Sequence, residues 1–124
     1  MNRYPAQLRD PADIRWDFLA HFLPYGIEPT DIDLLIERNG RFLALEGKRA
    51  GVSIPTGQRR CLGELDALPE FTVVHFEGYP PDDVTACAKW GQELSWTDTE
   101  HLRDRIARWF EWADKQQRIR RCQP

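Results

Sequence analysis

The chain has 124 residues, of which 41% are hydrophobic and 30% charged, and its formal net charge at pH 7 is −3. This length and composition favour one globular domain spanning residues 1–124 over two domains. No apolar run approaches the ~18 residues of a membrane span, and the first residues lack the apolar core of a signal peptide. We therefore expect a cytoplasmic protein that does not enter a membrane.

Several common catalytic motifs are absent from the sequence. The three cysteines are far apart with no CxxC pair, so neither a disulfide framework nor a zinc knuckle is expected. There is no HExxH motif, which would indicate a zinc site. There is also no GxSxG motif and no local Cys–His pair, which disfavours nucleophilic catalysis. A phosphate-binding P-loop ending at Gly47-Lys48 would need Gly in place of Phe42 and Ser or Thr in place of Arg49.

Residues 9–24 are predicted to form the first helix. Asp10 is a candidate N-cap, Pro11 suits the first helical position, and Pro24 stops the helix. Apolar side chains recur at helical spacing and are expected in the core: Ile14, Phe18, Leu19, Phe22 and Leu23.

Two apolar runs on either side of Asn39-Gly40 predict a β-hairpin. Both turn residues tolerate a positive φ, which a two-residue type I′ turn requires. After a loop, residues 58–68 predict a short helix closed by Pro69, with Leu65 on its apolar face. Residues 71–76 then predict one buried strand.

The last third of the chain predicts two short strands and a long helix. The strands lie around Gly91, and Thr97 with Glu100 fits a capping box at the start of the helix. The order α-β-β-α-β-(β-β)-α predicts an α/β fold, with one mixed sheet flanked by helices and a long C-terminal helix. The predicted buried stripe of this helix contains Leu102, Ile106, Trp109, Phe110 and Ala113.

The two-residue turn determines the pairing of the hairpin, because opposed residue numbers then sum to 79. Asp33 faces Glu46 and Asp31 faces Lys48, and side-chain alternation places all four on one face. A three-residue loop would move Asp33 out of opposition. The other face is expected to be aliphatic and to enter the core: Ile32, Leu34, Ile36, Leu43 and Leu45.

Two opposed carboxylates destabilise a purely structural hairpin. Directly opposed β-carbons lie about 4.5–5.5 Å apart, so Asp33 and Glu46 should repel each other and one should protonate more readily. A divalent cation removes this cost, and Mg²⁺ commonly binds one or two carboxylates together with water. Lys48 is placed to orient an attacking water or to stabilise charge on a phosphate. The alternative is an Asp31–Lys48 ion pair beside two exposed carboxylates.

The stretch DIDLLIERNGRFLALEGK, residues 31–48, resembles the PD-(D/E)XK nuclease superfamily. In that superfamily an Asp begins one strand and a Glu-X-Lys ends the next. The order helix, hairpin, helix, strand over residues 10–76 also resembles its restriction-endonuclease-like core. Small phage-type and Holliday-junction-resolvase-like members resemble the chain best.

The resemblance implies a role for each residue of the motif. Asp33 and Glu46 would be ligands of Mg²⁺ or Mn²⁺, and the Gly47 carbonyl would bind the same ion. Lys48 would be the catalytic lysine. Gln58 resembles a glutamine that several branches of the superfamily place near the active site, so it completes the predicted catalytic set.

Two choices within the site stay open. Asp31 is the alternative to Asp33 as the first Asp, since the sequence PTDID offers both. An acidic residue near the first helix assists in some members of the superfamily, and the candidates in this chain are Asp13, Asp17 and Glu28.

Basic side chains near the predicted site indicate DNA as the partner. Arg49, Arg59 and Arg60 would contact backbone phosphates, mostly without reading the sequence. Two features depart from the superfamily pattern, namely Ile32 where Pro is usual and the net negative charge of the chain. A homodimer is left open, because so small a nuclease often needs two copies to cut both strands.

We therefore predict a Mg²⁺-dependent endonuclease, a hydrolase of phosphodiester bonds in DNA. The alternative is a non-catalytic protein of the same fold that binds nucleic acid or a protein partner, for which Trp112 offers an exposed aromatic contact. A metal-dependent phosphohydrolase acting on nucleotides is a weaker third hypothesis, because no Gly-rich phosphate loop is present. The sequence leaves open whether the substrate is duplex, branched or single-stranded.

Overall fold

The computed structural model describes residues 18–19, 22–27 and 29–121. Residues 1–30 and residues 31–124 form separate units, and each is considered by itself. The predicted hairpin, sheet and C-terminal helix all belong to the second unit.

In the first unit, the short 3-10 helix η3 spans Pro24–Gly26, and Tyr25 within it has a φ of 64°. The predicted first helix, residues 9–24, falls largely outside the described residues. So do the three acidic residues proposed to assist the site: Asp13, Asp17 and Glu28.

A five-stranded mixed sheet forms the centre of the second unit. Strands β2 and β3 are parallel, and the other neighbouring strands are antiparallel. Helix α2, Thr56–Asp66, provides the crossover between the parallel pair. The prediction of an α/β fold with one mixed sheet is therefore confirmed. In spatial order the strands are β1 Leu34–Arg38, β2 Arg41–Lys48, β3 Phe71–Tyr79, β4 Asp83–Lys89 and β5 Ser95–Trp96.

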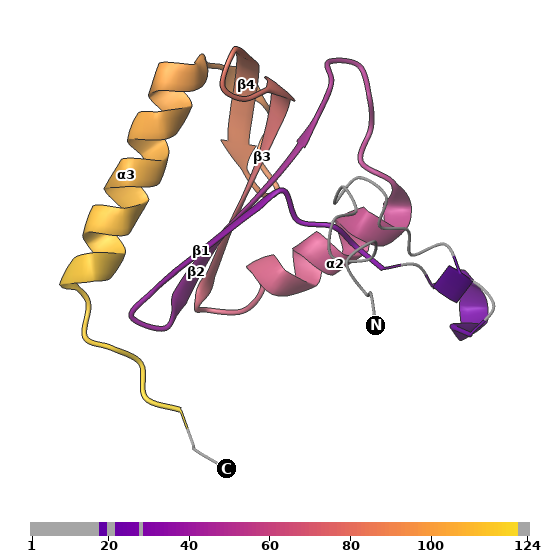
Figure 1. The fold of residues 1–124 in the computed structure, drawn as a ribbon, viewed down its shortest axis with the longest axis horizontal. Coiled ribbons are helices and arrows are strands. Elements are labelled where there is room, and N and C mark those ends of the chain that lie inside the picture. The colour runs from indigo at the N-terminus through magenta and orange to yellow at the C-terminus, as the bar shows by residue number, and fades with distance from the viewer. Residues whose placement is uncertain (1–17, 20–21, 28, 122–124) are drawn as a thin grey trace, which may run out of the picture. The chain divides into compact units, whose positions relative to one another are not determined.

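Two helices cover opposite faces of this sheet. Figure 1 shows α2 on one side of the strands and α3, Thr99–Lys115, on the other. On the α2 face, the fully buried Leu62 packs with Ala44 and Val73. Because side chains alternate along each strand, β2 and β3 contribute to both cores. On the α3 face, Leu102 packs in a larger cluster with Leu43, Leu45, Val74, Phe76, Val84 and Cys87.

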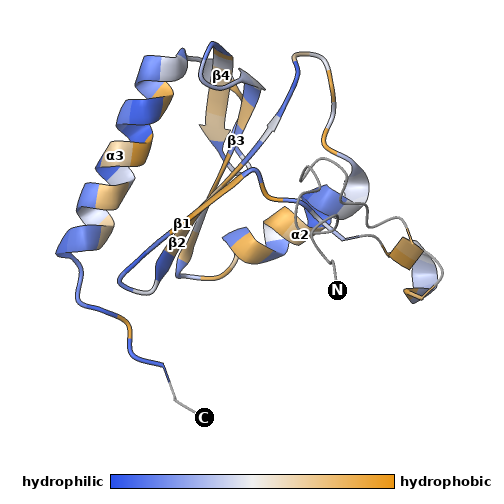
Figure 2. Ribbon diagram, viewed as in Figure 1, coloured by the Kyte–Doolittle hydropathy of each residue, from blue (hydrophilic) through white to orange (hydrophobic). Residues whose placement is uncertain are grey.

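The amphipathic character of α3 agrees with the sequence prediction except at one position. Figure 2 shows apolar residues along the central strands and hydrophilic residues along much of α3. Leu102 and Ala113 are buried, and Ile106 and Trp109 pack against the core. Phe110 was predicted in the buried stripe but is 40% exposed, because it lies at the edge of the helix face, where the Arg38 guanidinium lies 5.7 Å from its ring centroid.

Helix α3 begins one residue later than the predicted capping box requires. Asp98 is the N-cap, and its Oδ1 accepts a hydrogen bond of 2.8 Å from the His101 backbone N–H. Thr97 is buried, and its backbone N–H donates to the Thr85 carbonyl. The box of Thr97 and Glu100 is wrong because Asp is a stronger N-cap than Thr and sits one position further along.

The Asn39-Gly40 turn has the predicted geometry. Asn39 has a φ of 52° and Gly40 a φ of 83°, as a type I′ turn requires. The pairs from Leu34–Leu45 to Arg38–Arg41 follow the predicted register. The Asn39 side chain also donates to the end of α3 and the segment beyond it, at 3.0, 3.2 and 3.1 Å from the carbonyls of Ala113, Asp114 and Gln116.

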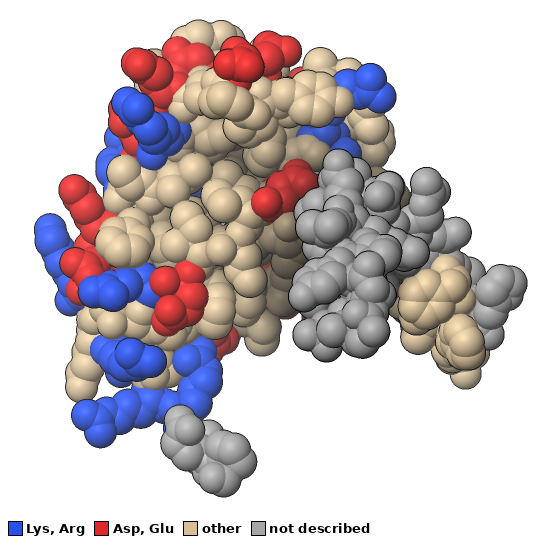
Figure 3. Space-filling model, in the orientation of Figure 1, with Lys and Arg blue, Asp and Glu red and all other residues tan. Residues whose placement is uncertain are grey.

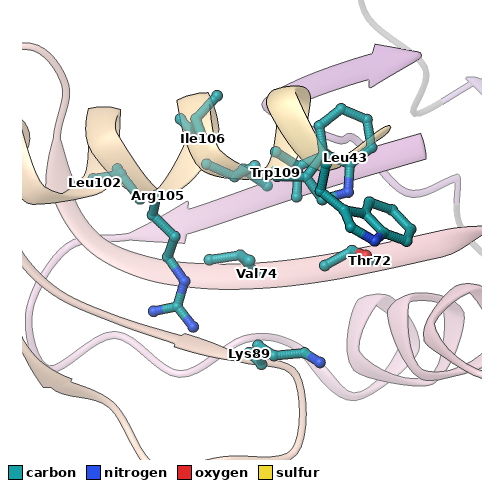
Figure 4. Close-up of a pocket in the computed structure, with 10 residues that line it drawn as sticks. Leu43, Thr72, Val74, Lys89, Leu102, Arg105, Ile106 and Trp109 are labelled. Carbon is teal, nitrogen blue, oxygen red and sulfur yellow. The ribbon is translucent and has the colours of Figure 1, made fainter. Parts of the chain in front are cut away.

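A pocket of about 290 Å³ lies between α3 and the sheet. Figure 4 shows Ile106 and Trp109 of α3 above Val74 of β3, with Leu43 of β2 beside Trp109. The Nε1 atom of Trp109 is buried and has no hydrogen-bond partner within the described residues. Within the same part of the chain, no helix has the length and apolar character needed to cross a membrane.

Candidate functional site

The predicted polar cluster lies where the hairpin ladder ends. The last ladder pair is Leu34–Leu45, so Asp33 and Glu46 are not a ladder pair as predicted. Instead, Asp33 Oδ2 accepts a hydrogen bond of 2.8 Å from the Gly47 backbone N–H. The chain before Leu34 has left the strand because a side-chain bond replaces the backbone bond that the ladder would make next.

This departure changes the face on which Ile32 lies. Strict alternation predicts Ile32 beside Leu43 and Leu45, but it packs against the cluster of Ala44 and Leu62 on the α2 face. The prediction for Ile32 is wrong because alternation holds only while the strand continues. The α2 face thus gains an apolar residue beside the polar cluster.

Glu46 is the most unusual residue of the cluster, because its carboxylate is buried. Its side chain is 2% exposed, and it lies on the α2 face with Ala44. Glu46 Oε2 accepts a hydrogen bond of 3.2 Å from Lys48 Nζ. Glu46 Oε1 is buried with no hydrogen-bond partner among the described residues. A buried carboxylate oxygen without a partner is costly unless a cation or a proton supplies one.

The surroundings of Glu46 raise the pKa of its carboxyl. Burial is the largest cause, and the negative charge of Asp33 acts in the same direction. The Lys48 ammonium and the Gln58 amide partly oppose the rise. The repulsion predicted between Asp33 and Glu46 is therefore present, although the two residues do not pair in the ladder.

The predicted pairing of Asp31 with Lys48 is wrong. Lys48 forms its ion pair with Glu46, two residues earlier on the same strand and face. The backbone carbonyl of Asp31 accepts a hydrogen bond of 3.1 Å from Gln58 Nε2. Gln58, in the first turns of α2, thus holds the segment that leads into Asp33.

Gly47 lies between Glu46 and Lys48 at a place where no side chain fits. A Cβ atom on Gly47 would lie 2.2 Å from Cε2 of the Phe76 ring. Gly47 is opposite Phe76 in the parallel ladder, so the ring covers the α-carbon from the α3 side. The Gly47 N–H points towards the β1 side, where it meets Asp33. Its carbonyl points to the same side, because both groups of one strand residue face the same neighbour.

The sequence predictions missed two residues that lie beside the cluster. His75 and Glu77 of β3 are the register partners of Glu46 and Lys48. Residues paired in a parallel ladder point to the same face, and neighbouring strands lie about 4.8 Å apart. The i, i+2 spacing of these two polar residues within an apolar strand was the only signal, and it does not reveal the strand with which they pair.

The predicted DNA-binding arginines are all exposed. Arg49 directly follows β2, and Arg59 and Arg60 lie in α2. Arg59 lines a pocket of about 340 Å³ together with His75 and Trp90. Figure 3 shows a further group of Lys and Arg side chains over the end of α3 and the tail beyond it. Basic side chains are therefore not confined to the predicted arginines.

The residues around Glu46 fit a hard divalent ion that keeps several waters. The described ranges contain no group of three His, Cys, Asp or Glu side chains able to enclose a metal. They do contain two carboxylates, Asp33 and Glu46, beside the backbone of Gly47. Mg²⁺ typically uses one or two carboxylates plus water rather than an all-protein cage. Oε1 of Glu46, which has no partner, is the atom that most needs such an ion.

Comparisons with protein-family models, with curated proteins and with solved structures found no match to this chain.

Proposed function

We propose that this chain is a metal-dependent nuclease of the PD-(D/E)XK type that hydrolyses phosphodiester bonds in DNA. The observation that carries the proposal is the buried Glu46 carboxylate, with one oxygen on Lys48 and the other without a partner. A purely structural strand gains nothing from such a group. An ion-binding carboxylate next to a lysine suits phosphoryl chemistry.

In this proposal each residue has a distinct task. Asp33 and Glu46 would hold the ion with their carboxylates, and the Gly47 carbonyl would complete the protein ligands. A bound Mg²⁺ or Mn²⁺ supplies Lewis acidity and a readily deprotonated water. Lys48 would stabilise the negative charge that develops on the phosphate in the transition state. Gln58 would act as a positioning residue through the Asp31 carbonyl.

The arrangement of the chain also supports the proposed restriction-endonuclease-like core. The Asp-bearing segment leads into β1, and the Glu-X-Lys residues end β2. Helix α2 then crosses to β3, which pairs in parallel with β2. This is the order of elements that the superfamily resemblance predicts after the first helix.

The test is a cleavage assay with Mg²⁺ or Mn²⁺ on single-stranded, duplex and branched DNA. Lys48→Met should lower kcat by at least about a hundredfold, since removing one preorganised group that stabilises developing charge typically costs 10²–10³ in kcat. Glu46→Gln, which keeps the side-chain shape, should abolish cleavage. Glu64→Gln changes an exposed glutamate of α2 and should cut like the unmodified chain. If no substrate is cut with either ion, the nuclease proposal is wrong.

A second candidate function has one observation in its favour. Trp96 is 75% exposed and Trp112 is 48% exposed, and exposed aromatic residues commonly anchor partners. A non-catalytic protein of the same fold would bind nucleic acid or protein through such residues. Binding that persists in EDTA, without cleavage and without any effect of Lys48→Met, would favour this alternative.

A further inference from the structure

A hollow of about 740 Å³ opens on the α3 side of the sheet, the face opposite to the one that carries Glu46. It lies between the ends of β1, β2 and β3 and the first half of α3, and Asp33 and Lys48 belong to its lining. The hollow therefore borders the candidate site at Asp33, Gly47 and Lys48, and Glu46 is not part of its lining. This volume lies in the range of pockets that bind small organic groups.

The interior of this hollow is apolar, but its margin is cationic. Phe76 and Leu102 form part of its buried wall, and both belong to the main core cluster. Arg49, from the segment after β2, and Arg103, from α3, reach it from different elements and are exposed. In the described part of the chain neither arginine forms an ion pair, whereas Lys48 is paired with Glu46. Asp33 is the one carboxylate among the lining residues.

An aromatic ring stands at the margin with the arginines. Tyr79, the last residue of β3, lines the hollow and is 59% exposed. An exposed aromatic face beside cations is the combination on which single-stranded nucleic acids bind, because bases stack on the ring while phosphates meet the charges. The same combination suits a duplex poorly, since paired bases present no free face.

We propose that this hollow binds an unstacked nucleobase of a single-stranded nucleic acid, and that Arg49 and Arg103 bind the flanking phosphates. This inference rests on the proposed function, because it names the form of substrate that the same site takes. A base in the hollow places the neighbouring phosphate beside Lys48 and Asp33, where the proposed hydrolysis occurs. Single strands and frayed ends are then preferred over intact duplex.

The first test compares three labelled oligonucleotides of equal length by fluorescence anisotropy, with Ca²⁺ in place of Mg²⁺. One is an oligothymidine strand, the second is a strand of abasic residues with the same phosphates, and the third is a duplex. We expect the base-carrying strand to bind at least about fivefold more tightly than either of the others. Equal affinities for the base-carrying and abasic strands overturn the inference.

The second test separates stacking from charge. Tyr79→Ala should weaken binding of the base-carrying strand and leave the abasic strand unchanged. Arg103→Ala should weaken binding of both strands by the same factor. Phe110→Ala and Arg108→Ala are matched controls, because both residues are exposed and lie outside the lining. If Tyr79→Ala behaves like Phe110→Ala, or changes only the oligomeric state in light scattering, the hollow is not a base site.

The two proposals fail in different ways. Base-dependent binding without any cleavage would leave this inference standing and remove the nuclease proposal. Metal-dependent cleavage at equal rates on duplex and single strands, with equal affinities for the abasic and base-carrying strands, would support the nuclease proposal and overturn this inference.

Discussion

Glu46 Oε2 lies 3.2 Å from Lys48 Nζ, while the other oxygen of the same carboxylate is buried without a partner. The Lys48 ammonium therefore satisfies only one of the two carboxylate oxygens, and the second can still accept a hydrogen bond or bind a cation. Lys48 is 27% exposed along its side chain and reaches solvent, whereas Glu46 does not. The oxygen without a partner affects the stability of the fold as well as the chemistry of the site.

The first consequence is a pH dependence of unfolding. The pKa of Glu46 is raised above the ordinary value of 4.5, mainly by burial. Between the unfolded and folded pKa values the native chain holds a proton that the unfolded chain has lost. This contribution to stability is therefore fully present below pH 4.5 and is lost as pH rises through the folded pKa. Urea unfolding at a series of pH values, in EDTA, should show it as a decline towards neutral pH.

Glu46→Gln tests the origin of that decline, because the amide cannot ionise. In this variant the free energy of unfolding should depend less on pH, because the Glu46 contribution is gone. The variant should also be more stable than the unmodified chain at neutral pH in EDTA. Glu64→Gln, at an exposed position of α2, should leave the pH dependence of the unfolding free energy unchanged. An unchanged slope in Glu46→Gln would show that other groups govern the pH dependence.

The second prediction concerns divalent ions and the choice between the two aspartates. Mg²⁺ or Mn²⁺ should raise the melting temperature, with a stabilisation of about 2.7 kcal/mol at a hundredfold excess over Kd. Asp33→Asn should abolish the effect, because Asp33 is the aspartate whose charge acts on Glu46. Asp31→Asn should keep it, since the structural contact of Asp31 is made by its backbone carbonyl. The reverse result would assign Asp31 as the ligand.

The third prediction concerns the glycine of the Glu-X-Lys stretch. Gly47→Ala would place a Cβ atom 2.2 Å from the Phe76 ring, so the ring or the strand must move. Overpacking of this kind typically costs about 1–3 kcal/mol of stability. Phe76→Leu in the same chain should recover part of the loss, which double-mutant unfolding curves measure. Strict additivity of the two substitutions would contradict the clash.

The fourth prediction concerns the indole of Trp109. Its buried Nε1–H has no partner within the described residues, so Trp109→Phe removes an unsatisfied donor and keeps most of the ring. Its cost in unfolding free energy should be clearly smaller than that of Trp109→Ala, because it removes fewer buried atoms and also removes the unsatisfied donor. Trp109→Ala should cost about 3–5 kcal/mol, because it leaves a cavity against Leu43 and Val74. A large loss in Trp109→Phe would mean that the N–H has an acceptor.

The sequence predicted best what short-range chemistry determines. Asn39-Gly40 specifies a turn with two positive φ values, and the hairpin register follows from it by counting. It predicted less well where a side chain competes with the backbone. The Asp33 side chain accepts the hydrogen bond from the Gly47 N–H, so the ladder ends at Leu34–Leu45 and Ile32 lies on the opposite face from the one predicted.

The remaining features depend on contacts between distant segments. The neighbours of Glu46 in the sheet come from β3, and no local pattern states which residue of β3 lies opposite it. The burial of Glu46 likewise depends on α2, which covers this face of the sheet and brings Gln58 close to the carboxyl, and the strand sequence alone does not reveal it. The predicted carboxylate pair was recognisable from the hairpin alone, but its unsatisfied oxygen was not.

The last prediction concerns Asn39, which joins the hairpin to the end of α3. Its Nδ2 donates to three carbonyls, and its own carbonyl accepts a hydrogen bond of 3.0 Å from the Ile119 N–H. Asn39→Gly keeps the positive φ but loses the side-chain bonds, at a cost of about 0.5–1.5 kcal/mol per net hydrogen bond. Asn39→Asp should cost more, because a carboxylate cannot donate and would face carbonyl oxygens. Urea unfolding measures both costs, and hydrogen exchange should show faster exchange at Ile119. Equal stability of all three chains would mean that this connection does not hold the tail.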